Sequence, residues 1–404
     1  MNAVGIDVSK GYSTVAILRP FGEIVASPFE VTHTNSELSE LAGKLKSLNG
    51  ETKVIMECTG IYHLPIACAL QEAGLIVCTI HAQLIHDFGN NTIRKGKTDK
   101  IDSLKIANYG LTHWLNLPEY IPEDEIRHML KAFNRQYNKY IKIKITLKNN
   151  LISILDQTFP GANELFTSPP RKSDGHEKWI DFAAKFWHCK CISSLSQKAF
   201  TDQYRKWCRR SGYNFSESKA EDIYIESLGH FNVMPKNNTT KLLITQAIMQ
   251  ISTIAESLAV VAREMQHLAS LLPEYPVVMD FRGVGDILCP QLMAEIGDIY
   301  RFKRKESLVC YAGLDVPPNQ SGTFESRNMG ISKKGSPHLR KALFQVMDCL
   351  LKHSPSDDNV YQFLDRKRAE GKHYYSYMTA GSAKFLRVYY ARVKQYLDKL
   401  CDEA

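Results

Sequence analysis

The order of short apolar runs and helical patterns in the first quarter of the chain constrains the fold most. Three strand-like runs, residues 4–8, 14–18 and 23–26, are joined by short turns that contain Gly or Pro, as in an antiparallel meander. A helix follows, in which Thr34 and Glu37 resemble a capping box. Strands at residues 53–56 and 75–80 then alternate with helical patterns. We therefore expect a mixed sheet that carries helices on both faces.

This series of three strands, a helix, and then alternating strands and helices is the RNase H-like topology. We predict an α/β domain of RNase H/RuvC type over residues 1–115. Its final helix contains Asp102, after a helix at about residues 64–73.

Four carboxylates fall where such a fold would gather them. Asp7 lies on the first strand, Glu57 ends the fourth, and Asp99 and Asp102 lie about one turn apart on the last helix. Ligands collect at the carboxyl ends of strands in open sheets, and carboxylates suit Mg²⁺, with Mn²⁺ as an alternative. We predict that all four are catalytic metal ligands. Taken alone, Asp99 is better explained as a helix cap.

Composition indicates a globular protein of two or three domains. The chain has 404 residues, 44% of them hydrophobic, and its apolar stretches are broken well before bilayer length. Its ten cysteines are scattered, mostly in apolar segments, which favours reduced thiols. We expect a cytoplasmic protein without a membrane partner.

Two long amphipathic helices are predicted in the middle of the chain, at about residues 122–155 and 244–265, the second with heptad spacing. They could pair within the chain, between chains, or both, and we expect a homo-oligomer, either a dimer or a tetramer. Residues 116–272 would form a coiled-coil region with an insert at about 161–236. In this insert His188, Cys189, Cys191 and Cys208 suggest zinc, but the spacing is poor for a tetrahedral site.

The last segment, residues 273–404, is predicted to be mostly α-helical. Its turn at Gly283 and Gly285 looks like a helix-hairpin-helix, in which backbone N–H groups approach a phosphate; an ordinary turn between core helices is the alternative. The net charge of +8 is modest, but basic residues cluster locally. The residues that we predict to bind nucleic acid are Lys10, Arg94, Lys95, Lys97, Gly283, Gly285, Arg301, Lys303, Arg304, Lys333, Lys334 and Arg340.

Both ends of the chain resemble one family, the DEDD-type transposases of insertion sequences that act as RNA-guided bridge recombinases and include relatives that invert pilin genes. The likeness rests on the segments around the four acids and on several downstream motifs. The downstream motifs are Gly283-Val284-Gly285, Ala294-Glu295-Ile296-Gly297-Asp298, Tyr311-Ala312-Gly313-Leu314, Ser321-Gly322 and Ile331-Ser332-Lys333-Lys334-Gly335.

The resemblance implies a RuvC-like domain, a coiled-coil middle, and a C-terminal transposase domain that supplies a nucleophilic serine. By the family pattern this serine is Ser321. The chain departs from relatives at Thr323, where a second glycine often stands. Rival serines are Ser326, Ser332 and Ser336.

The expected activity is therefore cutting and rejoining of DNA through a metal-assisted phosphoserine intermediate. The resemblance implies double-stranded donor and target DNA as partners, together with a noncoding guide RNA. Three alternatives stay open: a site-specific DNA invertase of the same family, a junction nuclease of the RuvC type that uses water, and a noncatalytic nucleic-acid-binding factor.

Overall fold

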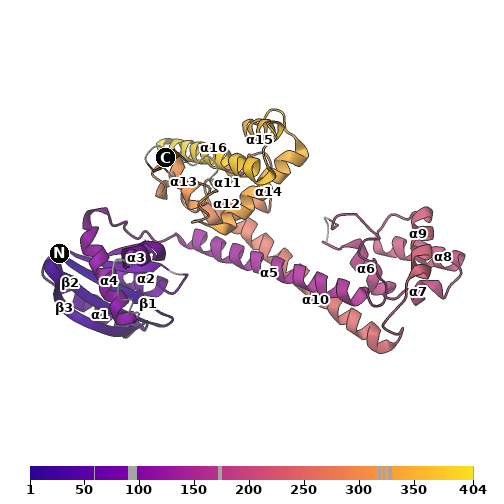
Figure 1. Ribbon diagram of the computed structural model, residues 1–404, viewed down its shortest axis with the longest axis horizontal. Coiled ribbons are helices and arrows are strands. Elements are labelled where there is room, and N and C mark those ends of the chain that lie inside the picture. Colours follow the sequence, from indigo (N-terminus) through magenta and orange to yellow (C-terminus); the bar gives the residue numbers. More distant parts are fainter. Residues whose placement is uncertain are drawn as a thin grey trace. The chain divides into compact units, whose positions relative to one another are not determined.

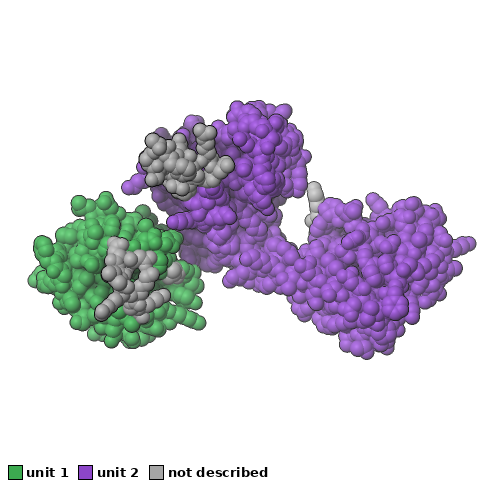
Figure 2. All heavy atoms as spheres, in the orientation of Figure 1, with its two compact units in different colours: residues 1–122 green, residues 123–404 purple. Residues whose placement is uncertain are grey.

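The computed structural model describes residues 1–58, 60–89, 98–171, 175–316, 320–321, 324–325, and 330–403. The chain divides into two compact units, Met1–Pro122 and Glu123–Ala404 (Figure 2).

The first unit is built on a five-stranded mixed sheet (Figure 1). Its strands are β1 (Asn2–Val8), β2 (Tyr12–Arg19), β3 (Glu23–Thr32), β4 (Thr52–Cys58) and β5 (Ile76–His81). They lie in the order β3-β2-β1-β4-β5, with β2 antiparallel to β1 and β3, and β4 parallel to β1 and β5. This arrangement confirms the predicted RNase H-like topology.

Helices cover both faces of the sheet, because alternate strand residues point to opposite sides. The helices are α1 (Asn35–Lys46), α2 (Leu64–Glu72), α3 (Ala82–Gly89) and α4 (Asp99–Thr112). Val4 and Ile6 of β1 pack in one core with α1 and α2. Ala3 packs in a second core with α3 and α4.

The α4 helix lies unusually close to β1. A Cβ atom on Gly5 would be 2.1 Å from the backbone oxygen of Ser103, and one on Gly110 would be 2.5 Å from Cδ1 of Ile55. Ser103, early in α4, contacts Gly5, whereas Gly110, late in α4, lies beside Ile55 and near Ala3, which precedes Gly5 on β1. The α4 helix therefore runs antiparallel to β1.

The second unit is organised by two long helices, α5 (Glu125–Leu155) and α10 (Asn238–Ser270). Leu130 of α5 shares a core with Met265 of α10, and Leu151 of α5 shares another core with Ile244 of α10. The helices are therefore antiparallel partners within the chain. Among the described residues α10 is also the one helix long and apolar enough to cross a membrane, but its packing against α5 accounts for part of that apolar surface.

Two groups of helices pack on the opposite ends of this pair. The inserted group contains α6 (Lys178–Lys185), α7 (Lys190–Ser193), α8 (Gln197–Ser211) and α9 (Glu217–Gly229). The C-terminal group contains α11 (Tyr275–Met279), α12 (Leu288–Ile296), α13 (Lys305–Tyr311), α14 (Pro337–His353), α15 (Asn359–Ala369), α16 (Tyr374–Glu403) and the short strands β6 (Gln320–Ser321) and β7 (Phe324–Glu325).

Candidate functional site

The register of the sheet brings Asp7 and Glu57 to neighbouring positions. Ile6 of β1 pairs with Met56 of β4, in parallel, and Asp7 and Glu57 are the next residues on these strands. In-register residues of parallel strands point to the same face. Gly5 and Ile55 both contact α4. Asp7 lies two residues after Gly5 and Glu57 two residues after Ile55, so each acid points to the same face of the sheet as its neighbour. Both acids therefore belong to the face that α4 covers.

The α4 helix adds the other two acids at this edge. Asp99 lies one turn before Ser103, the residue that contacts Gly5, and Asp102 immediately precedes Ser103. Because α4 runs antiparallel to β1, one turn toward its N-terminus advances about 6 Å, close to the two-residue step from Gly5 to Asp7. The Thr98 hydroxyl accepts a hydrogen bond from the Ile101 N–H and begins the helix. Thr98, rather than Asp99, therefore caps it.

The donor chemistry suits a divalent cation, although the side chains do not converge in this conformation. Among the described residues, no group of three His, Cys, Asp or Glu side chains could hold a metal ion. The Asp102 carboxylate instead receives the Lys105 ammonium at 3.0 Å. The two residues lie three apart on α4, so this ion pair follows from their local spacing.

The zinc alternative in the insert is not supported. The Nδ1 atom of His188 accepts the Lys190 N–H at 3.0 Å, and Nε2 lies 3.1 Å from the Met234 carbonyl. Burial raises the pKa of Cys189 and Cys208, which disfavours the thiolates that zinc needs. His188 is a buried core histidine.

Ser321 lies at the end of a short β-hairpin in the second unit. It is the last residue of β6 and pairs with Phe324, the first residue of β7. The rival Ser326 lies outside the described residues. Ser332 and Ser336 both have structural hydrogen bonds, to Asp315 at 2.5 Å and to Glu295 at 2.8 Å.

Backbone contacts close the base of the segment that carries Ser321. The Ser336 N–H bonds to the Tyr311 carbonyl at 2.9 Å, and the Lys333 N–H bonds to the Gly313 carbonyl at 3.1 Å. A Cβ atom on Gly335 would be 2.3 Å from the Tyr311 oxygen, so only glycine fits there. The two ends of the segment are therefore held together.

A buried polar network supports this base. The Glu295 side chain has no exposed surface, and its carboxylate accepts hydrogen bonds from Asn134 at 2.7 Å, Arg135 at 2.9 Å and Ser336 at 2.8 Å. It joins α5 and α12 to the start of α14. Sequence periodicity did not indicate a role for Glu295, because its partners are distant in the sequence. The one feature of the sequence that pointed to Glu295 was the family motif that contains it.

The predicted nucleic-acid-binding residues have different surroundings. Arg94, Lys95 and Lys97 lie outside the described residues. The exposed basic ones are Lys10, Arg301, Lys303, Arg304, Lys333 and Lys334.

Arg301, Arg340 and Gly283 take part in contacts within the chain, whereas a Cβ atom on Gly285 would meet no atom within 4 Å. The Arg340 guanidinium donates to the carbonyls of Ala312 and Gly335 at 2.8 and 3.2 Å, and that of Arg301 lies over the Phe302 ring. Gly283, with φ of 77°, approaches α14 so closely that a Cβ would be 3.1 Å from the Val346 oxygen. Packing therefore accounts for this glycine without a phosphate.

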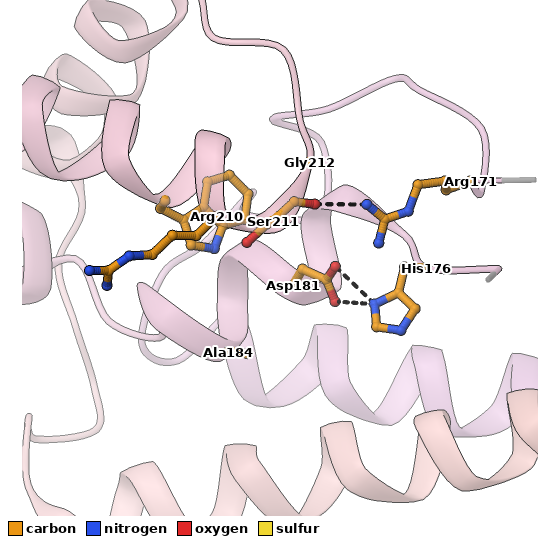
Figure 3. Close-up of a pocket in the computed structure, with 8 residues that line it drawn as sticks. Arg171, His176, Asp181, Ala184, Arg210, Ser211 and Gly212 are labelled. Carbon is orange, nitrogen blue, oxygen red and sulfur yellow. Dashed lines mark hydrogen bonds and ion pairs between the residues drawn. The ribbon is translucent and has the colours of Figure 1, made fainter. Parts of the chain in front are cut away.

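A separate pocket of about 520 Å³ opens in the inserted helices (Figure 3). His176 contacts both Asp181 oxygens, at 3.1 and 3.0 Å, and Arg171 donates to the Ser211 carbonyl at 2.7 Å. Arg210 lies on the other side of Asp181 from His176 in Figure 3. None of the predicted catalytic residues lines this pocket, so its size does not make it the candidate active site.

Two family models match the sequence at the regions described above. A model of DEDD-type IS110 transposases matches residues 4–160, and one described as "Transposase IS116/IS110/IS902 family" matches residues 275–362. The first match contains the four acids and the second contains Ser321. The chain belongs to the IS110 family of DEDD-type transposases.

Individual proteins that this chain resembles match over different lengths. The chain is 27% identical over 209 residues to the pilin gene-inverting protein of Moraxella bovis, covering 52% of this chain and 60% of that protein. It is 32% identical over 90 residues to the transposase for insertion sequence element IS1111A of Coxiella burnetii, covering 22% and 24% respectively. The chain thus spans about 60% of the Moraxella protein's length.

Among solved structures, RuvC of T. thermophilus in complex with a Holliday junction substrate covers 30% of this chain and 99% of RuvC, with 10% identity and a TM-score of 0.23. At this score the likeness adds nothing to the strand order already described.

Proposed function

We propose that this protein is a DNA recombinase that cuts and rejoins strands through a phosphoserine intermediate. One observation carries the proposal: Asp7 and Glu57 occupy adjacent in-register positions at the edge reached by the N-terminus of α4. Membership of a transposase family supports DNA as the substrate. Ser321, in the β6–β7 hairpin, would be a nucleophile that a simple nuclease does not need.

Asp7, Glu57, Asp99 and Asp102 would hold one or two divalent cations, with Mg²⁺ favoured and Mn²⁺ as the alternative. To do so Asp102 would exchange the Lys105 ammonium for the cation. A bound metal would supply positive charge to the scissile phosphate and to the attacking and leaving oxygens.

In the proposed reaction the Ser321 oxygen forms a bond to phosphorus as the bond to one deoxyribose oxygen breaks. The serine loses its proton and the departing deoxyribose oxygen gains one. Because one phosphodiester replaces another, the energy of the bond is retained, and a new strand end can reverse the step without ATP. Ser321 must reach the acids from its own chain or from another protomer.

The proposed partners are double-stranded donor and target DNA, a noncoding guide RNA, and further copies of the chain. A guide RNA would read sequence by base pairing, while the protein holds backbones by charge and shape. The exposed basic residues Lys303, Arg304, Lys333 and Lys334 support phosphate binding. An invertase of the same family remains the alternative, because the chain also matches a pilin gene-inverting protein.

The proposal is tested by covalent protein–DNA adducts on nicked donor DNA, resolved by denaturing electrophoresis in Mg²⁺. We expect adducts with the wild-type chain and with Ser326→Ala, a matched change at a rival serine. Ser321→Ala, Asp7→Asn and Glu57→Gln should form none. Adducts with Ser321→Ala would overturn the serine assignment, and nicked ends without any adduct would identify water as the nucleophile.

A further inference from the structure

Four basic side chains gather where Lys341 of α14 reaches Asn138 of α5. Arg135 and Lys142 lie seven residues apart on α5, so they share one face of the helix. His338 and Lys341 lie at the beginning of α14. The Lys341 ammonium donates to Oδ1 of Asn138, between the two α5 cations, at 2.8 Å. We name Arg135, Asn138, Lys142, His338 and Lys341 the α5–α14 junction.

Positive charge exceeds negative charge at the junction. The charged groups that act on His338 are Arg135, Lys142 and Lys341 against one acid, Glu295. Burial, followed by Arg135, lowers the pKa of His338, and burial with a smaller effect of Lys142 lowers that of Lys341. Glu295 already accepts hydrogen bonds from Asn134, Arg135 and Ser336. Cations held together in this way favour an added anion.

The junction can be reached from solvent. Lys142 and Lys341 are exposed, and the Arg135 side chain is 38% exposed. Lys341 is bonded to a neutral amide rather than to a carboxylate. A phosphate approaching from solvent could therefore contact both lysines while the Glu295 network stays intact.

The junction adjoins the segment that carries Ser321. This segment ends at Ser336, whose hydroxyl caps α14 by accepting the Leu339 N–H. His338 and Lys341 lie in the two turns that follow. Whatever binds the junction is therefore held beside the base of the Ser321 hairpin.

We propose that the α5–α14 junction binds backbone phosphates of the DNA strand that meets Ser321. The junction positions DNA and takes no part in bond breaking. The identity of the ligand as DNA rests on the proposed function, whereas phosphate binding can be measured without cleavage.

The test is the salt dependence of DNA binding by the full chain, measured by fluorescence anisotropy with a fluorescein-labelled duplex of random sequence. Lys142→Gln and Lys341→Gln remove one charge each, and glutamine at position 341 keeps an N–H donor near Asn138. Each should lower the slope of log Kd against log salt by about one, and the double variant by about two. Lys399→Gln is the matched control, because Lys399 is an exposed lysine near the end of α16.

Wild-type slopes in both junction variants would overturn the proposal. An equal decrease of the slope in Lys399→Gln would also overturn it, because DNA would then respond to positive charge anywhere on the surface. The same titrations with single-stranded RNA identify the source of the phosphates. Slopes that change with RNA but not with DNA would also overturn it.

The adduct assay separates this inference from the proposed function. The junction variants should need more DNA for half-maximal adduct yet reach the wild-type amount at saturation. Adducts formed by Ser321→Ala would overturn the serine mechanism. They would not bear on the junction, because the salt slopes of DNA binding are measured without cleavage.

Discussion

The Ser336 hydroxyl donates a hydrogen bond to the buried carboxylate of Glu295, with an Oγ–Oε2 distance of 2.8 Å. The same hydroxyl accepts the Leu339 N–H at 3.2 Å and so caps α14. One side chain therefore joins the end of the Ser321-bearing segment to both α12 and α14. The hairpin is anchored at its base by a core contact.

Glu295→Ala should destabilise the second unit by about 2–4 kcal/mol, because buried Asn134 loses its acceptor and Arg135 its counter-charge. Ser336→Ala should cost about 1–2 kcal/mol by removing the cap and the Glu295 contact. Denaturant unfolding measures both. Ser356→Ala, on an exposed loop, is the control and should change stability by less than about 0.5 kcal/mol. Equal stability of Glu295→Ala and the control would contradict the network's role.

Gly5→Ala should displace α4 from β1, because the added methyl would overlap the Ser103 oxygen. We expect a loss of about 1–3 kcal/mol and faster amide exchange in α4, measured by hydrogen–deuterium exchange. Gly43→Ala in α1 meets no atom within 4 Å and should be neutral or stabilising by about 0.5–1 kcal/mol. Equal stability and equal amide exchange in Gly5→Ala and Gly43→Ala would contradict the close approach of α4 to β1.

Glu274→Gln should destabilise the second unit by about 3–5 kcal/mol, because it removes the buried carboxylate and leaves the Arg127 guanidinium only the half-exposed Asp124 carboxylate, at 2.8 Å. Arg127 Nη2 and Glu274 Oε2 are 3.0 Å apart, and a second bond joins Nη1 to Oε1. The exposed pair Arg282–Asp357, also 3.0 Å apart, provides the control: Asp357→Asn should cost no more than about 1 kcal/mol. If thermal unfolding gave similar losses of stability for Glu274→Gln and Asp357→Asn, burial of the ion pair would not explain its contribution.

We expect His188 to lower the free energy of unfolding in mildly acidic solution. Burial lowers its pKa from the ordinary value of 6.5, so below pH 6.5 the unfolded chain binds a proton that the folded chain does not. Stability therefore falls as pH drops from 6.5 toward the folded-state pKa. His188→Gln should reduce this slope in melting temperatures measured against pH, with the remainder due to His33, His63 and His338, whose pKa values burial also lowers. An unchanged slope would exclude His188 as a contributor.

The topology of the first unit was predictable because its signals are local. Apolar runs of strand length and helical spacing in residues 4–80 follow from which side chains face a core. The third strand extends to Thr32, beyond the predicted residue 26, because Phe29 packs partly buried against the core. Element boundaries depend on such packing.

The sequence alone determined the order of elements in the first unit and the residue types able to bind a cation or attack a phosphate, because both are written in local patterns. Packing in three dimensions was needed to establish that α5 and α10 pair with each other, and that Glu295, Arg135 and Ser336 meet at the base of the Ser321-bearing segment. These contacts join residues up to 160 positions apart. No periodicity can specify them, since they depend on how helices of one unit pack in space.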